Sequence, residues 1–284
     1  MKNLLCDDNP ILMEGLHCCF YLDDQRLSER KKIVRTHNVE QHYYQKLSQA
    51  ERNPIKKIYF LQEAAKLESF EKKLLNASAL AAISVLDTEF YLQKHKNTKT
   101  ISAFHPDNKL SIVAGNGDFV LYHGNLSVGE NNAAALFLVK EIFSKINTSF
   151  IIAGNKPTEE LKLEAERYDN IQLIDNYSTK QITDLIRKAH INLLPTFQAT
   201  GIKLKLLSAL HNGRFCLVNS PMVKGTGLEK FCIIKDSPSE IISEIKNLML
   251  LPFSNQDIKL REELLTGDFS NAVNADRLIE IIED

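Results

Sequence analysis

Residues 171–195, IQLIDNYSTKQITDLIRKAHINLLP, contain the pattern that decides the fold. The apolar runs 171–174 and 191–194 have the length and composition of buried strands. Between them the residues Ile182, Leu185, Ile186 and Ala189 recur at helical spacing. A strand, a helix and a second strand in this order form a unit whose two strands run parallel, because the helix returns the chain to its starting edge.

The same alternation extends outward over residues 118–250. Apolar runs that indicate buried strands occur at 119–122, 150–153, 171–174, 191–194, 215–218 and 232–234. Nearly all-apolar strands that alternate with helices are typical of a parallel sheet covered by helices on both faces. We therefore predict an α/β domain with one doubly wound parallel sheet.

The first 110 residues show this pattern less completely. A long helical stretch covers residues 41–76, and Pro54 should interrupt it because proline cannot continue a helix. Strands are indicated at 33–35, 79–83 and 99–101. We expect a second α/β domain here that is incomplete.

The turn Gly115-Asn116-Gly117 separates the two patterns. We expect a partial N-terminal domain over residues 1–112 and a C-terminal domain over residues 113–268. Residues 269–284 should form a final helix, with Ser270 as its N-cap residue.

The composition is that of an ordinary globular protein. Among 284 residues, 35 Lys and Arg balance 36 Asp and Glu, which gives a net charge of −1. This argues against a protein that coats nucleic acid, because such a protein carries an excess of basic residues. The five cysteines show no Cys-x-x-Cys spacing, so we expect no metal site and a reducing compartment. No apolar run approaches the ~20 residues of a membrane span. Acidic residues follow the start too closely for a signal peptide, which predicts a cytoplasmic protein.

Two loops follow strand ends, where parallel sheets bind ligands. The first is 123–132, in which Gly124 would let a ligand approach the backbone. The helix after it offers free N–H groups to an anion. The alternative is a purely structural loop, because Ser127 and Glu130 have the spacing of a capping box.

The second loop, 195–205, leads into another helix. Lys203 and Lys205 in its first turn have the wrong charge for the positive end of a helix dipole. No acidic residue lies between Pro195 and Lys205 to compensate. A bound phosphate or diphosphate would reverse the sign of this effect. The alternative is that both lysines point into water.

One histidine has a position that suggests a site. His37 lies just past the expected strand end, in the run Arg35-Thr36-His37-Asn38, although a lone histidine is more often structural. His190 and His211 follow or end helices, and we expect both to be structural.

The run from Tyr122 to Glu229 resembles the C-terminal domain of the GT-B glycosyltransferases, in the retaining "glycosyl transferases group 1" superfamily. The histidine run near residue 37 resembles a strand end of their N-terminal domain. The matching pieces are Gly124-Asn125-Leu126-Ser127, Ile151-Ile152-Ala153-Gly154, Ile191-Asn192-Leu193-Leu194-Pro195 and Thr200-Gly201-Ile202-Lys203-Leu204-Lys205.

This resemblance implies the GT-B fold, which is α/β with two Rossmann-like domains, here with an incomplete N-terminal one. It implies transfer of a sugar from a UDP- or GDP-linked donor to a glycan or glycolipid acceptor, with retention and without a metal or cofactor. The nucleotide would lie mainly on the second domain and the acceptor on the first. The final helix would cross back to the first domain.

The resemblance also implies roles for single residues. Lys205, with Lys203 nearby, would neutralise the donor diphosphate as it leaves. Gly124 and Asn125 would let the phosphates approach the backbone. Gly201 would donate its N–H group to the same anion or to the sugar.

His37 would face the transferring sugar.

Two departures from the family pattern concern the donor. Thr200 and Ser208 occupy the positions of two family glutamates, of which the second normally holds the ribose hydroxyls. The basic residue usual in the first loop is missing from 127–132.

The leading hypothesis is a glycosyltransferase of cell-surface polysaccharide or glycolipid assembly. The alternative is a catalytically inactive relative that acts as a binding or scaffold subunit, and a third is a sugar-nucleotide epimerase. Expected partners are the nucleotide-sugar, the glycan or lipid-linked acceptor and the membrane surface, but not nucleic acid. Lysines in 55–75 would suit a membrane surface, although the glutamates among them favour a solvated helix. Recognition of the nucleotide base is expected around 175–178.

Overall fold

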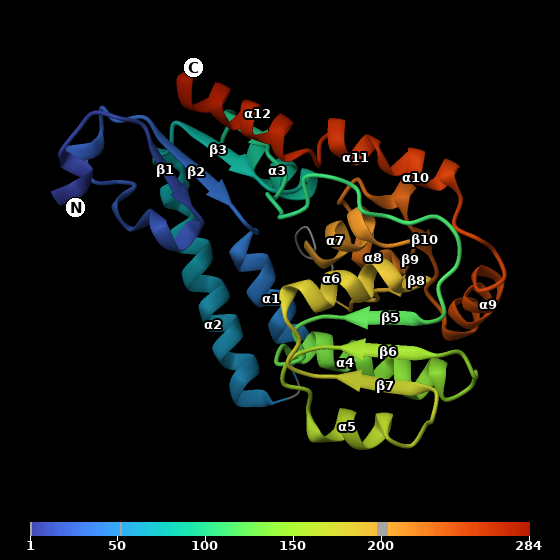
Figure 1. Ribbon diagram of the computed structural model, residues 1–284. Helices are drawn as coiled ribbons and strands as arrows, with labels where there is room; N and C mark the ends of the chain where they lie inside the picture. The colour runs from blue at the N-terminus through green and yellow to red at the C-terminus, as the bar shows by residue number, and fades with distance from the viewer. Residues whose placement is uncertain (1, 52, 198–203) are drawn as a thin grey trace. The chain divides into compact units, whose positions relative to one another are not determined.

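The computed structural model describes residues 2–51, 53–197 and 204–284. By their contacts these residues form two compact units. One unit contains residues 2–104 together with Asp268–Asp284, and the other contains residues 105–197 and 204–267. Figure 1 shows the elements of both units along the chain.

The first unit is built on a sheet of four parallel strands in the order β1-β2-β3-β4 (Figure 1). The strands are β1 (Ile11–Glu14), β2 (Lys32–Thr36), β3 (Ala79–Ala82) and β4 (Thr98–Thr100). The three strands expected from the sequence are confirmed as β2, β3 and β4. The sequence did not indicate β1, because its alternating burial gives no continuous apolar run.

Helices surround this sheet. They are α1 (Glu40–Ala50), α2 (Pro54–Glu71), α3 (Val85–Leu92) and α12 (Asn271–Glu283), with the short 3-10 helices η1 (Lys2–Leu5), η2 (Leu16–Tyr21), η3 (Gln25–Leu27) and η4 (Lys72–Asn76). Pro54 ends the expected long helix as predicted and begins α2, where its missing N–H costs no helical hydrogen bond. The side chain of Asn53 caps α2 by accepting from the N–H groups of Ile55 and Lys56.

Alternate residues of the strands supply the two cores of the first unit. Ile33, Ala79 and Ala81 point to one face, where Leu278 and Ile281 of α12 cover them. Neighbouring strand residues face a larger core formed with η2, η4 and α3. Ser270 caps α12 as expected, with its side chain accepting from Val273 N–H.

The second unit carries six parallel strands in the order β10-β9-β8-β5-β6-β7. This confirms the predicted doubly wound sheet. The strands are β5 (Val120–His123), β6 (Phe150–Ala153), β7 (Ile171–Ile174), β8 (Ile191–Leu193), β9 (Phe215–Val218) and β10 (Ile233–Ile234). The expectation of full burial is wrong for the two edge strands: β7 exposes Gln172, and both residues of β10 are half-buried.

The helices of this unit from α4 to η6 lie between successive strands along the chain, and α9, α10 and α11 follow the last strand (Figure 1). They are α4 (Gly129–Phe137), the π-helix η5 (Leu138–Phe143), α5 (Glu159–Ala165), α6 (Thr179–Lys188), α7 (Leu204–Asn212), α8 (Ser220–Val223), the 3-10 helix η6 (Glu229–Phe231), α9 (Pro238–Leu248), α10 (Asn255–Arg261) and α11 (Glu263–Thr266).

The strand order places a switch point between β5 and β8. From β5 the chain builds outward through β6 and β7, and then β8 returns to the other side of β5. Connections after β5 and β8 therefore leave the sheet in opposite directions, which opens a crevice at the carboxyl ends of these strands. The loops after β5 and β8 are the two that the sequence singled out.

Candidate functional site

The loop after β5 is folded around the side chain of Asn125. Its Oδ1 accepts hydrogen bonds from the backbone N–H of Ser127 at 3.1 Å and from the Ser127 hydroxyl at 2.8 Å. Helix α4 starts at Gly129, with Val128 as N-cap and no side-chain cap. The predicted capping box between Ser127 and Glu130 is therefore wrong, because Asn125 competes successfully for the serine.

Two glycines let this loop lie close to the sheet. A Cβ on Gly154, at the end of β6, would lie 2.3 Å from Leu126 Cγ and 2.5 Å from the carbonyl oxygen of Gly124. A Cβ on Gly124 would lie 3.3 Å from the side chain of Asn131. Gly154 therefore permits the close packing of the loop, and Gly124 leaves room for the amide of Asn131.

Lys205 lies in the first turn of the described part of α7 and is half-buried. Its ammonium donates a hydrogen bond to Asn131 Oδ1 at 2.9 Å and lies 5.2 Å from the centre of the Tyr122 ring. The alternative that this lysine points into water is therefore wrong. A cation over an aromatic face is stabilised in addition to its hydrogen bond.

Asn131 connects Lys205 to the loop after β5. Its side-chain Nδ2 donates to the backbone carbonyl oxygen of Asn125 at 3.0 Å, so that both Oδ1 and Nδ2 of the side-chain amide form hydrogen bonds. The backbone carbonyl of Asn131 accepts from the Tyr122 hydroxyl at 3.0 Å. The ammonium is thus held beside the backbone of the loop. Asn131 carries no signal of this role in the sequence, because its partner lies 74 residues away.

The start of the loop after β8 is also fixed. Thr196 exchanges two hydrogen bonds with the side chain of Asn219: its N–H donates to Oδ1 at 3.0 Å, and its carbonyl accepts from Nδ2 at 2.7 Å. The hydroxyl of Thr196 donates to the carboxylate of Glu130 on α4. These contacts join the two loops across the switch point, and the sequence signalled neither Asn219 nor Thr196.

His123 closes β5 and is almost fully buried, at 5% exposure. Burial lowers its pKa to about 3, and the charge of Lys205 acts in the same direction. Among the residues that the structure describes, the Nε2 atom of this neutral ring has no hydrogen-bond partner. His123 carries no signal in the sequence beyond its place at the start of loop 123–132.

The structure gives less information on the other residues that are expected to bind the nucleotide-sugar. Ser208 lies on α7, half-buried, one turn beyond Lys205. Thr200, Gly201 and Lys203 lie outside the described residues. In the segment expected to recognise the base, Asp175 Oδ1 accepts from the N–H groups of Lys156 at 3.1 Å and Asn176 at 2.7 Å.

In the first unit, His37 follows β2 and contacts a carboxylate. Its Nε2 lies 3.0 Å from Oε2 of Glu14, the last residue of β1. The same carboxylate oxygen lies 3.8 Å from Nε of the buried Arg35. Glu14 was not anticipated from the sequence, because the strand that carries it was not.

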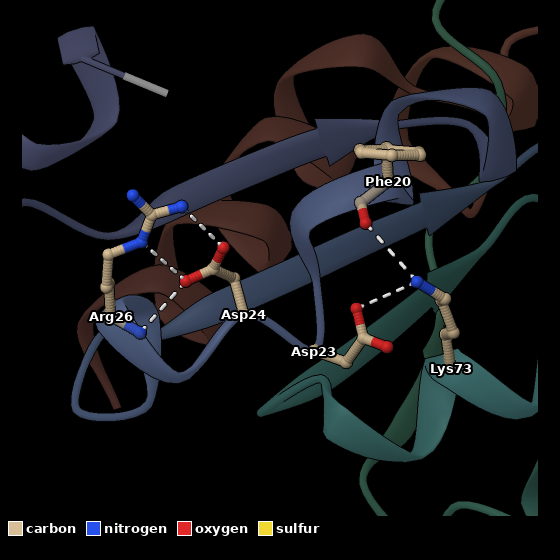
Figure 2. Close-up of polar contacts among 5 residues, drawn as sticks. All are labelled: Phe20, Asp23, Asp24, Arg26 and Lys73. Carbon is tan, nitrogen blue, oxygen red and sulfur yellow. Dashed lines mark hydrogen bonds and ion pairs between the residues drawn. The ribbon is translucent and has the colours of Figure 1, made fainter.

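Figure 2 shows how the segment between β1 and β2 is anchored. Asp24 caps η3 and pairs with the guanidinium of Arg26 at 2.8 Å, and these hydrogen bonds lower the pKa of Asp24 to about 2. Lys73 donates to Asp23 Oδ1 at 2.8 Å and to the carbonyl oxygen of Phe20 at 3.4 Å. The segment is thereby tied to η4.

The remaining histidines singled out are structural, as expected. His190 is fully buried, and its Nδ1 accepts from Gly117 N–H at 3.0 Å while its Nε2 lies 2.8 Å from the carbonyl oxygen of Leu248. His211 is buried, with Nδ1 at 2.9 Å from the carbonyl oxygen of Leu207. Over residues 2–51, 53–197 and 204–284, no three His, Cys, Asp or Glu side chains gather as a metal site would require.

Comparisons with known proteins place this geometry in a known fold. No family model matches the sequence. An uncharacterised 44.6 kDa protein of the cps region of Klebsiella pneumoniae is 27% identical over 261 residues, which cover 84% of this chain and 66% of that protein. None of the helices described above is long and apolar enough to span a membrane.

Solved structures extend the comparison. The crystal structure of TarM superposes with a TM-score of 0.70 at 13% identity, over 99% of this chain and 56% of that chain. A TarM variant from S. aureus, in complex with fondaparinux, α-GlcNAc-glycerol and UDP, gives 0.66 at 14% identity over 96% and 55%. A UDP-glucosyltransferase from Polygonum tinctorium gives 0.52 at 12% identity over 97% and 75%.

The chain therefore has the GT-B glycosyltransferase fold, as the sequence resemblance implied. It spans about half the length of the TarM chains and 66% of the Klebsiella protein. At these identities the likeness concerns the fold alone.

Proposed function

We propose that this chain is a glycosyltransferase that moves a sugar from a nucleotide-sugar to a glycan or glycolipid acceptor with retention, in cell-surface polysaccharide synthesis. The observation that carries the proposal is the ammonium of Lys205, which Asn131 and the Tyr122 ring hold at the switch point of a parallel sheet. Ligands of open parallel sheets bind at this point. The UDP present with the TarM variant supports a UDP-linked donor, and GDP is the other candidate.

Lys205 would act on the leaving group. As the bond between the anomeric carbon and the diphosphate oxygen breaks, negative charge grows on that oxygen, and a fixed ammonium stabilises it. The acceptor hydroxyl forms the new bond on the same face of the sugar, and its proton passes to the departing diphosphate. In this scheme lysine supplies the positive charge, so neither a metal nor a cofactor takes part.

Other residues would also bind the donor, in the roles that the sequence resemblance implied. We assign Lys203 and Gly201 to the diphosphate together with Lys205, and the backbone at Gly124 and Asn125 to the phosphates. Thr200 and Ser208 would contact the donor without the negative charge of glutamate, and His37 would contact the transferring sugar.

The lipid-linked form of the acceptor suggests contact with a membrane surface through α2. Ile55, Ile58 and Tyr59 on this helix are 78%, 57% and 53% exposed, and Lys56 and Lys57 lie among them. Apolar side chains flanked by lysines suit an anionic interface. Flotation with vesicles that contain phosphatidylglycerol tests this contact: wild-type protein should float, and Ile58→Asp should not. If the wild type stays at the bottom at low salt, α2 is a solvated helix.

A transfer assay tests the activity. The purified protein of residues 1–284 is incubated with UDP- and GDP-sugars and an oligosaccharide acceptor, and the product anomer is determined by proton NMR. We expect one donor to be consumed with an unchanged anomeric configuration and Lys205→Ala to lose most of the turnover. Lys140→Ala, which removes an exposed lysine of the same unit, should leave it unchanged. Equal turnover in Lys205→Ala would contradict the assignment.

The second candidate is a catalytically inactive relative that serves as a binding or scaffold subunit. Ser208 favours it, because a serine replaces the acidic residue that the sequence resemblance leads one to expect at this position of α7. Nucleotide binding without transfer to any acceptor would select this candidate. Interconversion of the donor sugar without an acceptor would instead select an epimerase.

A further inference from the structure

The carboxyl ends of β1 and β2 bring a carboxylate, a guanidinium and an imidazole together. The parallel register pairs Glu14 with Arg35, and His37 follows two residues later. Glu14 Oε2 lies 3.0 Å from His37 Nε2 and 3.8 Å from Arg35 Nε. Glu14 has no part in the function proposed above, although it touches the histidine that is assigned to the sugar.

Arg35 gives this arrangement a positive charge in a fixed position. Its side chain is 4% exposed, its guanidinium lies 4.5 Å from the centre of the Phe104 ring, and its Nη2 donates to the carbonyl oxygen of Ser102 at 2.7 Å. A charge that is buried in this way cannot move to solvent, and it attracts an anion nearby. The guanidinium therefore attracts the Glu14 carboxylate, whose side chain is 51% exposed at the end of β1.

The contact with Glu14 decides what His37 can offer to a ligand. A carboxylate only accepts hydrogen bonds, so the imidazole nitrogen beside it must carry the proton. In a neutral imidazole the other nitrogen then holds a lone pair. His37 would thus present Nδ1 as an acceptor. A Cβ on Gly15, a glycine at φ +91°, would lie 3.5 Å from this atom and 2.8 Å from Nδ1 of His17.

We propose that Glu14 is the positioning residue of His37: it fixes the Nε2–H tautomer and the ring orientation, so that Nδ1 accepts a hydrogen bond from a sugar hydroxyl. The identity of that hydroxyl rests on the proposed function, whereas the tautomer does not. No covalent step involves Glu14, which acts only through the ring. Carboxylates that orient a histidine in this manner are a general device of active sites.

The tautomer can be measured without activity. Protein labelled with ¹⁵N-histidine is studied by long-range ¹H–¹⁵N correlation NMR at a pH where the imidazole is neutral, and His37→Gln assigns the signal. We expect the Nε2–H pattern in the wild type and in Glu14→Gln, whose amide oxygen still accepts. Glu14→Ala should give a mixture of tautomers, while Glu29→Ala, a change at an exposed glutamate of the same unit, should match the wild type. An Nδ1–H pattern in the wild type, or an unchanged pattern in Glu14→Ala, would overturn the proposal.

Kinetics then separate this proposal from the proposed function. With the donor identified, Glu14→Ala should lower kcat by about 10-fold or more through misplacement of the ring and leave the donor KM unchanged. Glu14→Gln should recover most of that loss. If His37→Ala abolishes transfer and Glu14→Ala does not lower kcat, the positioning role fails and the transferase stands. If the tautomers behave as expected but no donor is turned over, the positioning role stands and the transferase fails.

Discussion

The ammonium of Lys205 donates a hydrogen bond to Asn131 Oδ1 at 2.9 Å, and the same amide donates to the backbone of Asn125 at 3.0 Å. One side chain thus joins the helix after β8 to the loop after β5. The two elements leave the sheet in opposite directions, and this contact keeps a positive charge at the crevice between them. Several testable consequences concern this contact and the packing around it.

The first concerns Asn131 itself. Asn131→Ala should weaken binding of a nucleoside diphosphate by about 5-fold, because the loss of one hydrogen bond of roughly 1 kcal/mol frees the lysine. Asn131→Asp keeps an acceptor for Lys205 but adds negative charge beside the anion, so its affinity should fall further. Calorimetric titration measures both, with the exposed Asn147→Ala as control. Unchanged affinity in Asn131→Asp would show that the anion binds elsewhere.

A pair of glycines tests the packing of the loop after β5. Gly154→Ala should destabilise the protein by about 1–3 kcal/mol, because the new Cβ would overlap Leu126 and the carbonyl oxygen of Gly124. Gly129→Ala, in the first turn of α4, meets no atom of the described residues within 4 Å and should be neutral or slightly stabilising. Urea denaturation of both variants gives the comparison. Equal midpoints for the two would mean that the loop does not pack as described.

Stability should depend on pH through His123. Its imidazole has a pKa near 6.5 in the unfolded chain, and burial lowers this pKa to about 3 in the folded protein. Below pH about 6.5 the unfolded chain binds a proton that the folded chain does not. The stability that the neutral His123 contributes is therefore fully present above pH about 6.5 and is lost as pH falls toward about 3. His123→Phe should therefore lose less stability than the wild type between pH about 7.5 and about 5. Urea midpoints at the two pH values measure this difference, and parallel losses would refute it.

His190 should matter for stability and not for the ligand. Its ring accepts from Gly117 N–H and contacts the carbonyl oxygen of Leu248, so His190→Phe leaves two buried backbone groups without their partner. Each such group costs about 1–3 kcal/mol, which predicts a clearly lower melting temperature. Nucleotide affinity, measured where the variant is folded, should equal that of the wild type. A loss of affinity without a loss of stability would give His190 a functional role.

The sequence predicted the strands of the second unit well for a physical reason. Strands buried on both faces are almost entirely apolar, so runs such as 150–153 can be recognised in the sequence and end where polar residues begin. Edge strands follow this rule less closely. The edge strand β1 alternates buried and exposed residues over Ile11–Glu14, and it was missed together with Glu14.

The candidate site was predicted only in part. Glycines and lysines in strand-end loops carry a local signal, and this signal located Gly124 and Lys205. Asn131 and Thr196 carry none, because their partners come from segments that are distant in sequence. The expected capping box failed for a related reason: spacing shows which hydrogen bonds are possible, whereas Asn125 determines which one Ser127 makes.

The most direct test of the account is a calorimetric titration of the protein of residues 1–284 with UDP and with GDP, at low salt. We predict saturable binding of one of the two nucleotides. Lys205→Ala should weaken it by about 10-fold or more, because a hydrogen bond to a charged group contributes about 1.5–3 kcal/mol, while Lys140→Ala should match the wild type. Equal affinity in Lys205→Ala and the wild type, or no binding of either nucleotide, would contradict a donor site at the switch point of β5 and β8.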